Sequence, residues 1–597
     1  MQKKHLLTNL LKQAKVIGYS LKLLWQSAPR ETLLLAFCLA IQGLIPALTL
    51  ITFRESIHFL TNHITPFPWF IFALWAVVLF FETLFEPILS FLRLRVNEKI
   101  LAHFNILLMK KANDIKGLGF LENKQSASEL KQLRDEVRYR PINLIYILTS
   151  GVREWIGLVS VLVLLSTAIW WLPFLILIAA LPNAISTMWR EKQAWEYALL
   201  RSPESQQMSA LAQQTLDLRA AKEIRLFGFG DFLIKKYQAI SKDFQHHMSQ
   251  NRQALFARFI LLSLPSILGD FLIFYLVISH AMSGLMKSSE VVMAVQGLIT
   301  VQRTIGLITQ NLGMFSQVYS FFDKFRDFIQ KTKSDLFVPR KTKTLSKIHG
   351  DITFENVTFA YHKDTPVLKN INLKLKAGET IALVGENGAG KSTLVKLLCR
   401  FYDPNQGTIS VDGTDLKELD LPWWYEHMSC VLQDFAEYPM TIRENIGIGN
   451  WKKMEDTSLI EKAAQQGGLH AVHFNKGYDT LLGKPFGGTT LSGGEWQKIA
   501  VSRAFMRPAN FLILDEPTAS LDARSEQEVF HSFSKLSKGK TSLLITHRLG
   551  SVSMADRILV MKQGEIIEDG THQSLLQKGG EYASLYQLQT SNYTLNR

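Results

Sequence analysis

Residues 385–392 of this 597-residue chain read GENGAGKS, from Gly385 to Ser392. An apolar run at 381–384 precedes them, and a helical pattern begins at Lys391. A glycine-rich turn between a strand and a helix lets backbone N–H groups close on phosphate oxygens, and the helix N-terminus adds its dipole. The stretch therefore predicts a P-loop that holds a nucleoside triphosphate.

The side chains of this loop have separate tasks. We expect Lys391 to reach the β- and γ-phosphates and the Ser392 hydroxyl to bind Mg²⁺. The residues expected to contact the nucleotide in this segment are Gly385, Asn387, Gly388, Gly390, Lys391, Ser392 and Thr393.

Two carboxylates follow a second apolar run, at 511–514. Asp515 would close that strand and hold Mg²⁺, and Glu516 would polarise an attacking water. By itself, Asp-Glu after an apolar strand is more often a solvated loop. The P-loop upstream favours the catalytic reading.

The first part of the chain has the composition of a membrane protein. Apolar residues make up 47% of the sequence, which is high for a charged cytosolic enzyme. Residues 1–340 hold 37 Lys and Arg against 23 Asp and Glu, whereas residues 341–597 hold 29 of each. The basic residues flank apolar runs, which indicates the positive-inside pattern and not nucleic-acid binding.

Apolar runs long enough to cross a bilayer recur six times, and each needs about 20 residues. The expected spans are 33–53, 66–90, 143–169, 170–188, 259–282 and 290–313. Basic residues are concentrated at the N-terminus and in the two long segments, 93–140 and 190–258, which we expect to be helical extensions. Both termini and both extensions should therefore be cytoplasmic. Residues 1–30 predict an amphipathic helix on the inner membrane surface, with an ordinary soluble helix as the alternative.

These patterns divide the chain into three parts. Residues 1–335 form a membrane domain that includes the N-terminal interfacial helix and both cytoplasmic extensions. Residues 336–349 are a linker, and residues 350–597 are an α/β nucleotide-binding domain with buried parallel strands. The fold class is thus a polytopic α-helical membrane domain of six transmembrane helices plus an α/β P-loop domain.

A second motif, Leu491-Ser492-Gly493-Gly494-Glu495, follows the P-loop about a hundred residues later. With the P-loop and the Asp-Glu pair, it makes the chain resemble an ABC exporter of the half-transporter kind over nearly its whole length. In that family the motif usually ends in Gln, and it meets ATP held by the partner's P-loop. The resemblance implies that two copies sandwich two ATP molecules, with Ser492, Gly493 and Gly494 at the nucleotide.

The resemblance also assigns roles to single residues. Gln433 would sense Mg²⁺, His547 would contact the γ-phosphate, Asp522 would link the two sites, and Tyr361 would stack on adenine. Residues 221–228 resemble the second coupling helix, and residues 118–133 would hold the first; a solvated amphipathic helix is the alternative for 221–228. One departure is that 483–488 lacks the acidic residue expected in many exporters.

Polar residues inside the spans suggest a cargo pathway. Gln296, Arg303, Gln310 and Gln317 recur every seven residues, so they share one face of the last span. Asp270 and Arg303 have similar expected depths, which suggests an ion pair, although snorkelling or a structural salt bridge is the alternative.

The leading functional hypothesis is an ATP-hydrolysing exporter of an amphipathic cargo (peptide, lipid or drug). It would act as a homodimer in a bacterial inner membrane, with a heterodimer left open. The alternative is an ATP-gated channel or a transport-silent sensor on the same scaffold. A soluble ATPase acting on nucleic acid is excluded by the six spans, so no nucleic-acid partner is expected.

Overall fold

The computed structural model describes residues 2–61, 69–115, 117–196, 203–330, 343–362, 365–470, 474–483, 487–516, 523–546 and 552–594. These residues form two compact units. The first consists of residues 1–113 and 127–331, and the second of residues 114–126 and 332–597. The second unit therefore includes a short segment from the middle of the membrane part of the sequence. Half of the expected linker, residues 336–342, lies outside the described part of the chain.

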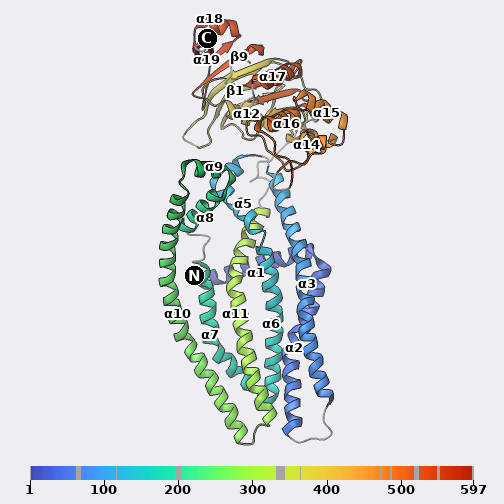
Figure 1. Cartoon of the computed structure of the whole chain (residues 1–597), viewed down its shortest axis with the longest axis vertical. Coiled ribbons are helices and arrows are strands. Elements are labelled where there is room, and N and C mark those ends of the chain that lie inside the picture. Colours follow the sequence, from blue (N-terminus) through green and yellow to red (C-terminus); the bar gives the residue numbers. More distant parts are fainter. Residues whose placement is uncertain are drawn as a thin grey trace. The chain divides into compact units, whose positions relative to one another are not determined.

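The first unit is a bundle of long helices that run side by side (Figure 1). Six helices of the described chain are long and apolar enough to cross a membrane. They are α2 (Pro29–Thr61), α3 (Trp69–Asp114), α6 (Arg140–Ala168), α7 (Leu172–Glu196), α10 (Gly230–Met282) and α11 (Ser288–Gln330). The prediction of six transmembrane helices is thus confirmed.

Several of these helices continue far beyond the thickness of a bilayer. At 1.5 Å per residue, the 53 residues of α10 extend about 80 Å. The long polar stretches of the sequence are helical, as expected: α3 continues without a break to Asp114, and α5 (Lys124–Glu136), α8 (Pro203–Leu216) and α9 (Leu218–Phe227) lie between the spans. The N-terminal helix, α1 (Gln2–Ser27), runs across the long helices in Figure 1. Its Lys12 pairs with Asp323 of α11 at 2.8 Å.

Close helix packing holds the bundle together, with small residues at points of contact. A Cβ on Gly297 of α11 would lie 2.6 Å from Leu165 of α6, so these two helices approach closely there. Leu165 and Val301 are fully buried in the same apolar cluster. Many large apolar side chains on the outside of the bundle are exposed, for example Trp69 and Phe271. Exposed apolar side chains are expected where the surrounding medium is lipid.

The second unit is an α/β domain built on two sheets. An antiparallel sheet has the order β2-β1-β4-β5. Its strands are β1 (Ile352–Phe359), β2 (Leu368–Leu375), β4 (Gln406–Val411) and β5 (Thr414–Asp415). A six-stranded sheet has the order β10-β9-β3-β8-β7-β6, in which β9, β3, β8, β7 and β6 are parallel neighbours.

The larger sheet decides where the site is. Its strands are β3 (Thr380–Val384), β6 (Met428–Val431), β7 (Phe511–Asp515), β8 (Thr541–Ile545), β9 (Arg557–Lys562) and β10 (Glu565–Gly570). The apolar runs at 381–384 and 511–514, which were predicted to be strands, are β3 and β7. Because parallel strands end at the same edge of a sheet, the segments after β3, β6 and β7 lie close together.

Candidate functional site: the P-loop and its surroundings

The P-loop connects β3 to α12 (Lys391–Leu398) through backbone conformations that favour glycine. Gly385, Gly388 and Gly390 have φ values of +149°, +82° and +107°. Gly390 is the N-cap of α12. At Gly385 a Cβ would lie 2.1 Å from the carbonyl oxygen of Met561 in β9, so only glycine fits between the loop and the neighbouring strand. The turn is therefore fixed both by its own backbone and by the sheet.

Lys391 is buried at the first position of this helix. Its Nζ donates to the carbonyl oxygens of Gly385 and Glu386, at 2.7 and 2.9 Å. Burial lowers the pKa of Lys391, and the Glu516 and Asp515 carboxylates oppose that shift. A buried cation facing two carboxylates is typical of a site that handles phosphate and a divalent metal.

Asp515 and Glu516 stand together at the end of β7. Burial, followed by the charge of Glu516, raises the pKa of Asp515 to about 6, and a hydrogen bond with Ser392 acts in the opposite direction. Asp515 Oδ1 is buried and has no hydrogen-bond partner among the described residues. An orphaned carboxylate oxygen beside a serine hydroxyl fits the oxygen ligands that Mg²⁺ requires.

Glu516 is held in a strained conformation. Its φ is +49°, a left-handed value that costs a residue other than glycine about 1 kcal/mol. Its backbone N–H donates to the Ile545 carbonyl at 3.0 Å, and its Oε2 accepts from Gln433 Nε2 at 3.2 Å. Backbone strain of this kind is concentrated at functional sites.

A cavity of about 500 Å³ joins these groups. Its lining residues include six of the seven expected P-loop contacts together with the amide and carboxylate expected to act on the nucleotide. They are Val367, Asn387, Gly388, Gly390, Lys391, Ser392, Thr393, Gln433 and Glu516. Val367 lines the cavity but was not singled out in the sequence, because an apolar residue in a loop between strands carries no chemical signal.

Tyr361 lies next to the cavity and not in its lining. Its hydroxyl is 3.3 Å from Thr393 Oγ1, and its ring makes an edge contact with Tyr402 at 5.3 Å between centroids. The side chain of Tyr361 is 38% exposed, so its ring can still receive a flat partner.

The short helix α4 (Gly119–Glu122) packs beside this aromatic group within the second unit. Glu122 pairs with Lys396 of α12 at 2.9 Å and accepts a hydrogen bond from the Tyr402 hydroxyl. The Leu118 N–H donates to the Phe401 carbonyl at 3.1 Å. The Lys396 ammonium lies 5.4 Å from the Tyr361 ring centroid. A segment between membrane-spanning helices therefore reaches the predicted adenine-stacking residue through two side chains.

The second motif lies at the start of another helix, α16 (Gly493–Phe505), with Ser492 as its N-cap. None of Ser492, Gly493 and Gly494 lines the cavity around the P-loop. Ser492 is exposed. Within one chain, the structure does not bring this motif to the P-loop.

Two predicted site residues, His547 and Asp522, lie outside the described residues, as does the 484–486 part of the unusual segment.

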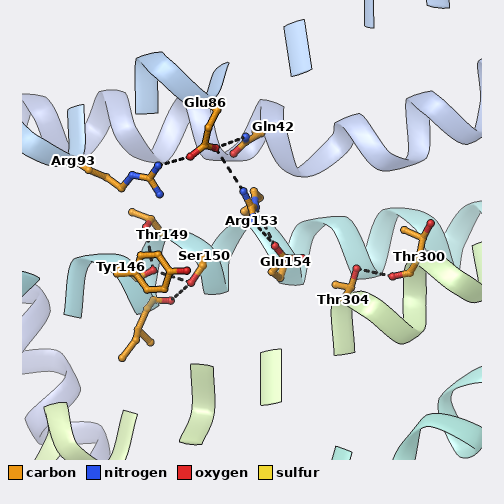
Figure 2. Close-up of polar contacts among 11 residues, drawn as sticks. Gln42, Glu86, Arg93, Tyr146, Thr149, Ser150, Arg153, Glu154, Thr300 and Thr304 are labelled. Carbon is orange, nitrogen blue, oxygen red and sulfur yellow. Dashed lines mark hydrogen bonds and ion pairs between the residues drawn. The ribbon is translucent and has the colours of Figure 1, made fainter. Parts of the chain in front are cut away.

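The membrane unit contains a network of charged and polar side chains (Figure 2). Glu86 of α3 pairs with Arg93 at 2.6 Å and with Arg153 of α6 at 3.8 Å, and it accepts from Gln42 of α2 at 3.4 Å. Arg153 also pairs with the buried Glu154 at 2.6 Å. The network joins three membrane-spanning helices. The pairing of Arg153 with Glu86 is apparent only once the helices are placed side by side.

The suggested ion pair between Asp270 and Arg303 is wrong. Asp270 instead accepts a hydrogen bond from Gln302 Nε2 at 2.6 Å. Gln302 precedes Arg303 by one residue, and a step of one residue turns a helix by about 100°. Depth alone therefore could not identify which of the two side chains faces α10.

Gln296, Arg303 and Gln310 are all exposed on α11. Their exposure is consistent with the seven-residue spacing, which places them on one face of the helix. Gln317 also belongs to α11, but its side chain is outside the description.

Comparisons with known proteins agree with this architecture. Residues 368–519 match the family model described as "ABC transporter". The subtilin transport ATP-binding protein SpaT of Bacillus subtilis is 30% identical over 538 residues, which are 88% of this chain and 85% of that protein. The nisin transport ATP-binding protein NisT of Lactococcus lactis subsp. lactis is 27% identical over 95% of both chains. A solved structure of a bacterial Atm1-family ABC exporter with ATP bound has a similar fold, with a TM-score of 0.76 and 23% identity, over 94% of this chain and 99% of that one.

We predict that Gly385→Ala weakens ATP binding at least about tenfold, because its Cβ would overlap the Met561 carbonyl and displace the loop. Gly413→Ala is the control: Gly413 also has a positive φ, +79°, but no atom lies within 4 Å of its added Cβ. The control should lose about 1 kcal/mol of stability and keep its ATP affinity. Titration with a fluorescent ATP analogue measures the difference, and unchanged affinity in Gly385→Ala would contradict the described packing.

Proposed function

This chain belongs to the ABC transporter family as an exporter of the half-transporter form, and from this premise we propose that two copies assemble into one transporter with ATP bound between them. The chain itself combines an integral membrane domain with an ATP-binding domain. It is an ATPase that drives export of an amphipathic cargo. The pairing of copies, the role of each residue and the chemical class of the cargo (peptide, lipid or drug) are what we propose.

The placement of the second motif carries the proposal. Ser492 lies exposed at the N-terminus of α16 and outside the lining of the P-loop cavity of its own chain. Backbone N–H groups at a helix N-terminus attract anions. A second copy in head-to-tail orientation would supply this helix N-terminus to the triphosphate, and each chain would complete the site of the other. Because one chain contains each expected catalytic residue, a homodimer would have two competent sites.

Within each site, the residues have distinct roles. Ser392, Asp515 and Gln433 would hold Mg²⁺, which supplies charge neutralisation of the phosphates when bound. Lys391 binds the β- and γ-phosphates, and Tyr361 stacks on adenine. Glu516 accepts a proton from the attacking water, and Gln433, which contacts Glu516, orients that water. His547 contacts the γ-phosphate, and Asp522 links the two sites.

We propose that α4 transmits the state of this site to the membrane domain. Glu122 contacts Lys396 and Tyr402, and both lie beside Tyr361. Movement of α12 as nucleotide binds would therefore move the segment that continues into the membrane-spanning helices. The apolar end of α9, where Leu226 and Phe227 are exposed, would serve as the second coupling contact.

The membrane is proposed to be a bacterial cytoplasmic membrane, with both termini in the cytoplasm. Basic residues at the N-terminus and in the two helical extensions support this orientation. The bilayer is then crossed by the six long helices, and α1 would lie along its inner surface.

For the cargo we favour a peptide over a lipid or a drug. The relatives matching 88% and 95% of this chain are named for the transport of subtilin and nisin. An ATP-dependent lipid A-core flippase of Alcanivorax borkumensis is more similar, 43%, but only over 41% of the chain. A screen of ATPase stimulation by amphipathic peptides, lipids and drugs in lipid nanodiscs tests this choice. In proteoliposomes, accumulation against a gradient distinguishes the pump from a channel, which gives only downhill flux.

Replacing Glu516 by Gln should leave ATP binding intact and lower hydrolysis at least ~100-fold, the scale expected for a lost general base. Steady-state phosphate release and ATP binding are measured on the same preparation. Near-normal turnover would show that another group activates the water.

Replacing Glu122 by Ala should reduce the stimulation of ATPase by cargo several-fold, because this side chain loses its ion pair to Lys396 and its hydrogen bond from Tyr402. The matched control is Glu426→Ala, which removes a comparable exposed ion pair, to Lys452 at 2.6 Å, away from α4. An exposed ion pair contributes only about 0–1 kcal/mol, so neither variant should unfold. Equal stimulation in the two variants would exclude the proposed role of α4.

Replacing Gln296 and Gln310 together by Leu should change the ranking of cargoes in transport assays, because the exposed face of α11 loses its amide groups. ATP affinity, measured without cargo, serves as the control and should stay unchanged. If several cargoes kept the same ranking, this face would not line the pathway.

A further inference from the structure

The exposed end of α16 is closed by a capping box that engages the very hydroxyl proposed to meet ATP. Ser492 Oγ donates to Glu495 Oε2 at 2.8 Å, and the Ser492 N–H donates to the same oxygen at 2.7 Å. In return, the Glu495 N–H donates to Ser492 Oγ at 3.3 Å. A serine hydroxyl can donate one hydrogen bond, and here it donates that bond to the carboxylate of Glu495.

The charge of Glu495 makes this contact stronger than an ordinary cap. Hydrogen bonds to an ionised acceptor are roughly twice as strong as neutral ones. Among the described residues, no cation lies within ion-pair distance of the Glu495 carboxylate. Its carboxylate also lies at the helix N-terminus, where it offsets the positive end of the helix dipole. Both effects oppose the approach of a triphosphate to Ser492.

The same chain contains a matching box where no nucleotide is expected. At the start of α14 (Ile442–Gly447), Thr441 Oγ1 and the Thr441 N–H both donate to Glu444 Oε2 at 2.8 Å. The Glu444 N–H donates back to Thr441 Oγ1 at 3.1 Å. This second box has the same geometry but no expected contact with nucleotide. It therefore serves as a control that shows what the loss of a capping box does to the fold alone.

We propose that Glu495 is a positioning residue that holds the Ser492 hydroxyl away from the triphosphate, so that two copies close over ATP only when this box opens. The inference rests on the proposed function, because it requires that Ser492 meets ATP bound by the partner copy. The closed box weakens the apparent affinity for ATP in the step in which the two nucleotide-binding domains close. ADP, which lacks the γ-phosphate, should not be affected.

The test uses the full-length chain in lipid nanodiscs, with labels that report the approach of the two nucleotide-binding domains. Glu495→Gln keeps the shape of the box and removes the charge, whereas Glu444→Gln makes the same change at the control box. In a Glu516→Gln background, Glu495→Gln should lower the ATP concentration for half-maximal closing about fivefold. The control should close at the same ATP concentration as the parent, and ADP binding should be the same in all three proteins. Both variants should show the same small fall in melting temperature, because each loses one charged cap.

Steady-state kinetics give a second readout that a structural cap would not move. With Glu516 intact, Glu495→Gln should lower KM for ATP more than it changes kcat, and Glu444→Gln should change neither. Equal closing concentrations for Glu495→Gln and Glu444→Gln would overturn the inference.

Ser492→Ala distinguishes this failure from that of the proposed function. If Ser492→Ala raises the closing concentration while Glu495→Gln does not lower it, the shared ATP site stands and the role of Glu495 falls. If Ser492→Ala leaves closing by ATP unchanged, then Ser492 does not meet the nucleotide and both proposals fall.

Discussion

The nucleotide site depends on one electrostatic attraction, between the buried Lys391 ammonium and the carboxylates of Asp515 and Glu516 at the end of β7. Each of these groups would be costly to bury alone. The ammonium and the carboxylates lower that cost for each other, whereas the two carboxylates repel each other. The parallel order of β3, β8, β7 and β6 brings them together, because their carboxyl ends share one edge of the sheet. The glycines of the P-loop then let the backbone approach without a side chain in the way. The raised pKa of Asp515 and the left-handed backbone of Glu516 are the local costs of this arrangement.

The contacts of α4 connect the P-loop helix to a segment that lies between two membrane-spanning helices in the sequence. A four-residue helix has little stability of its own. Its position is set by an ion pair, a hydrogen bond from Tyr402 and a backbone contact, all to residues at or just after α12. The P-loop helix therefore has the phosphate site at one end and a segment of the membrane part of the sequence at the other. Such a helix can pass a small displacement from one to the other, since packed elements move as units.

Polar groups in the membrane unit are stabilised by partners on neighbouring helices. Glu86 is shared by two arginines and a glutamine from three helices, so charges that would be expensive in lipid compensate one another. Asp270 is satisfied by a neutral amide. Among the described residues, the side chains of Gln296, Arg303 and Gln310 on the exposed face of α11 form no hydrogen bond or ion pair with another helix. For this reason we propose this face, and not the charged network, for contact with cargo.

The sequence by itself determined the six spans, the helical nature of the long polar segments, the P-loop and the strands that surround it. These features depend on local periodicity, on glycine and on runs of apolar residues, which a single chain displays directly. Only the tertiary structure decided that Glu86 pairs with Arg153, that Gln302 and not Arg303 meets Asp270, and that α4 folds with the nucleotide-binding domain. Each of these depends on which face of one element meets another far away in the chain. One residue of rotation on a helix changes that face completely, and spacing along the sequence does not record how two helices are turned toward each other.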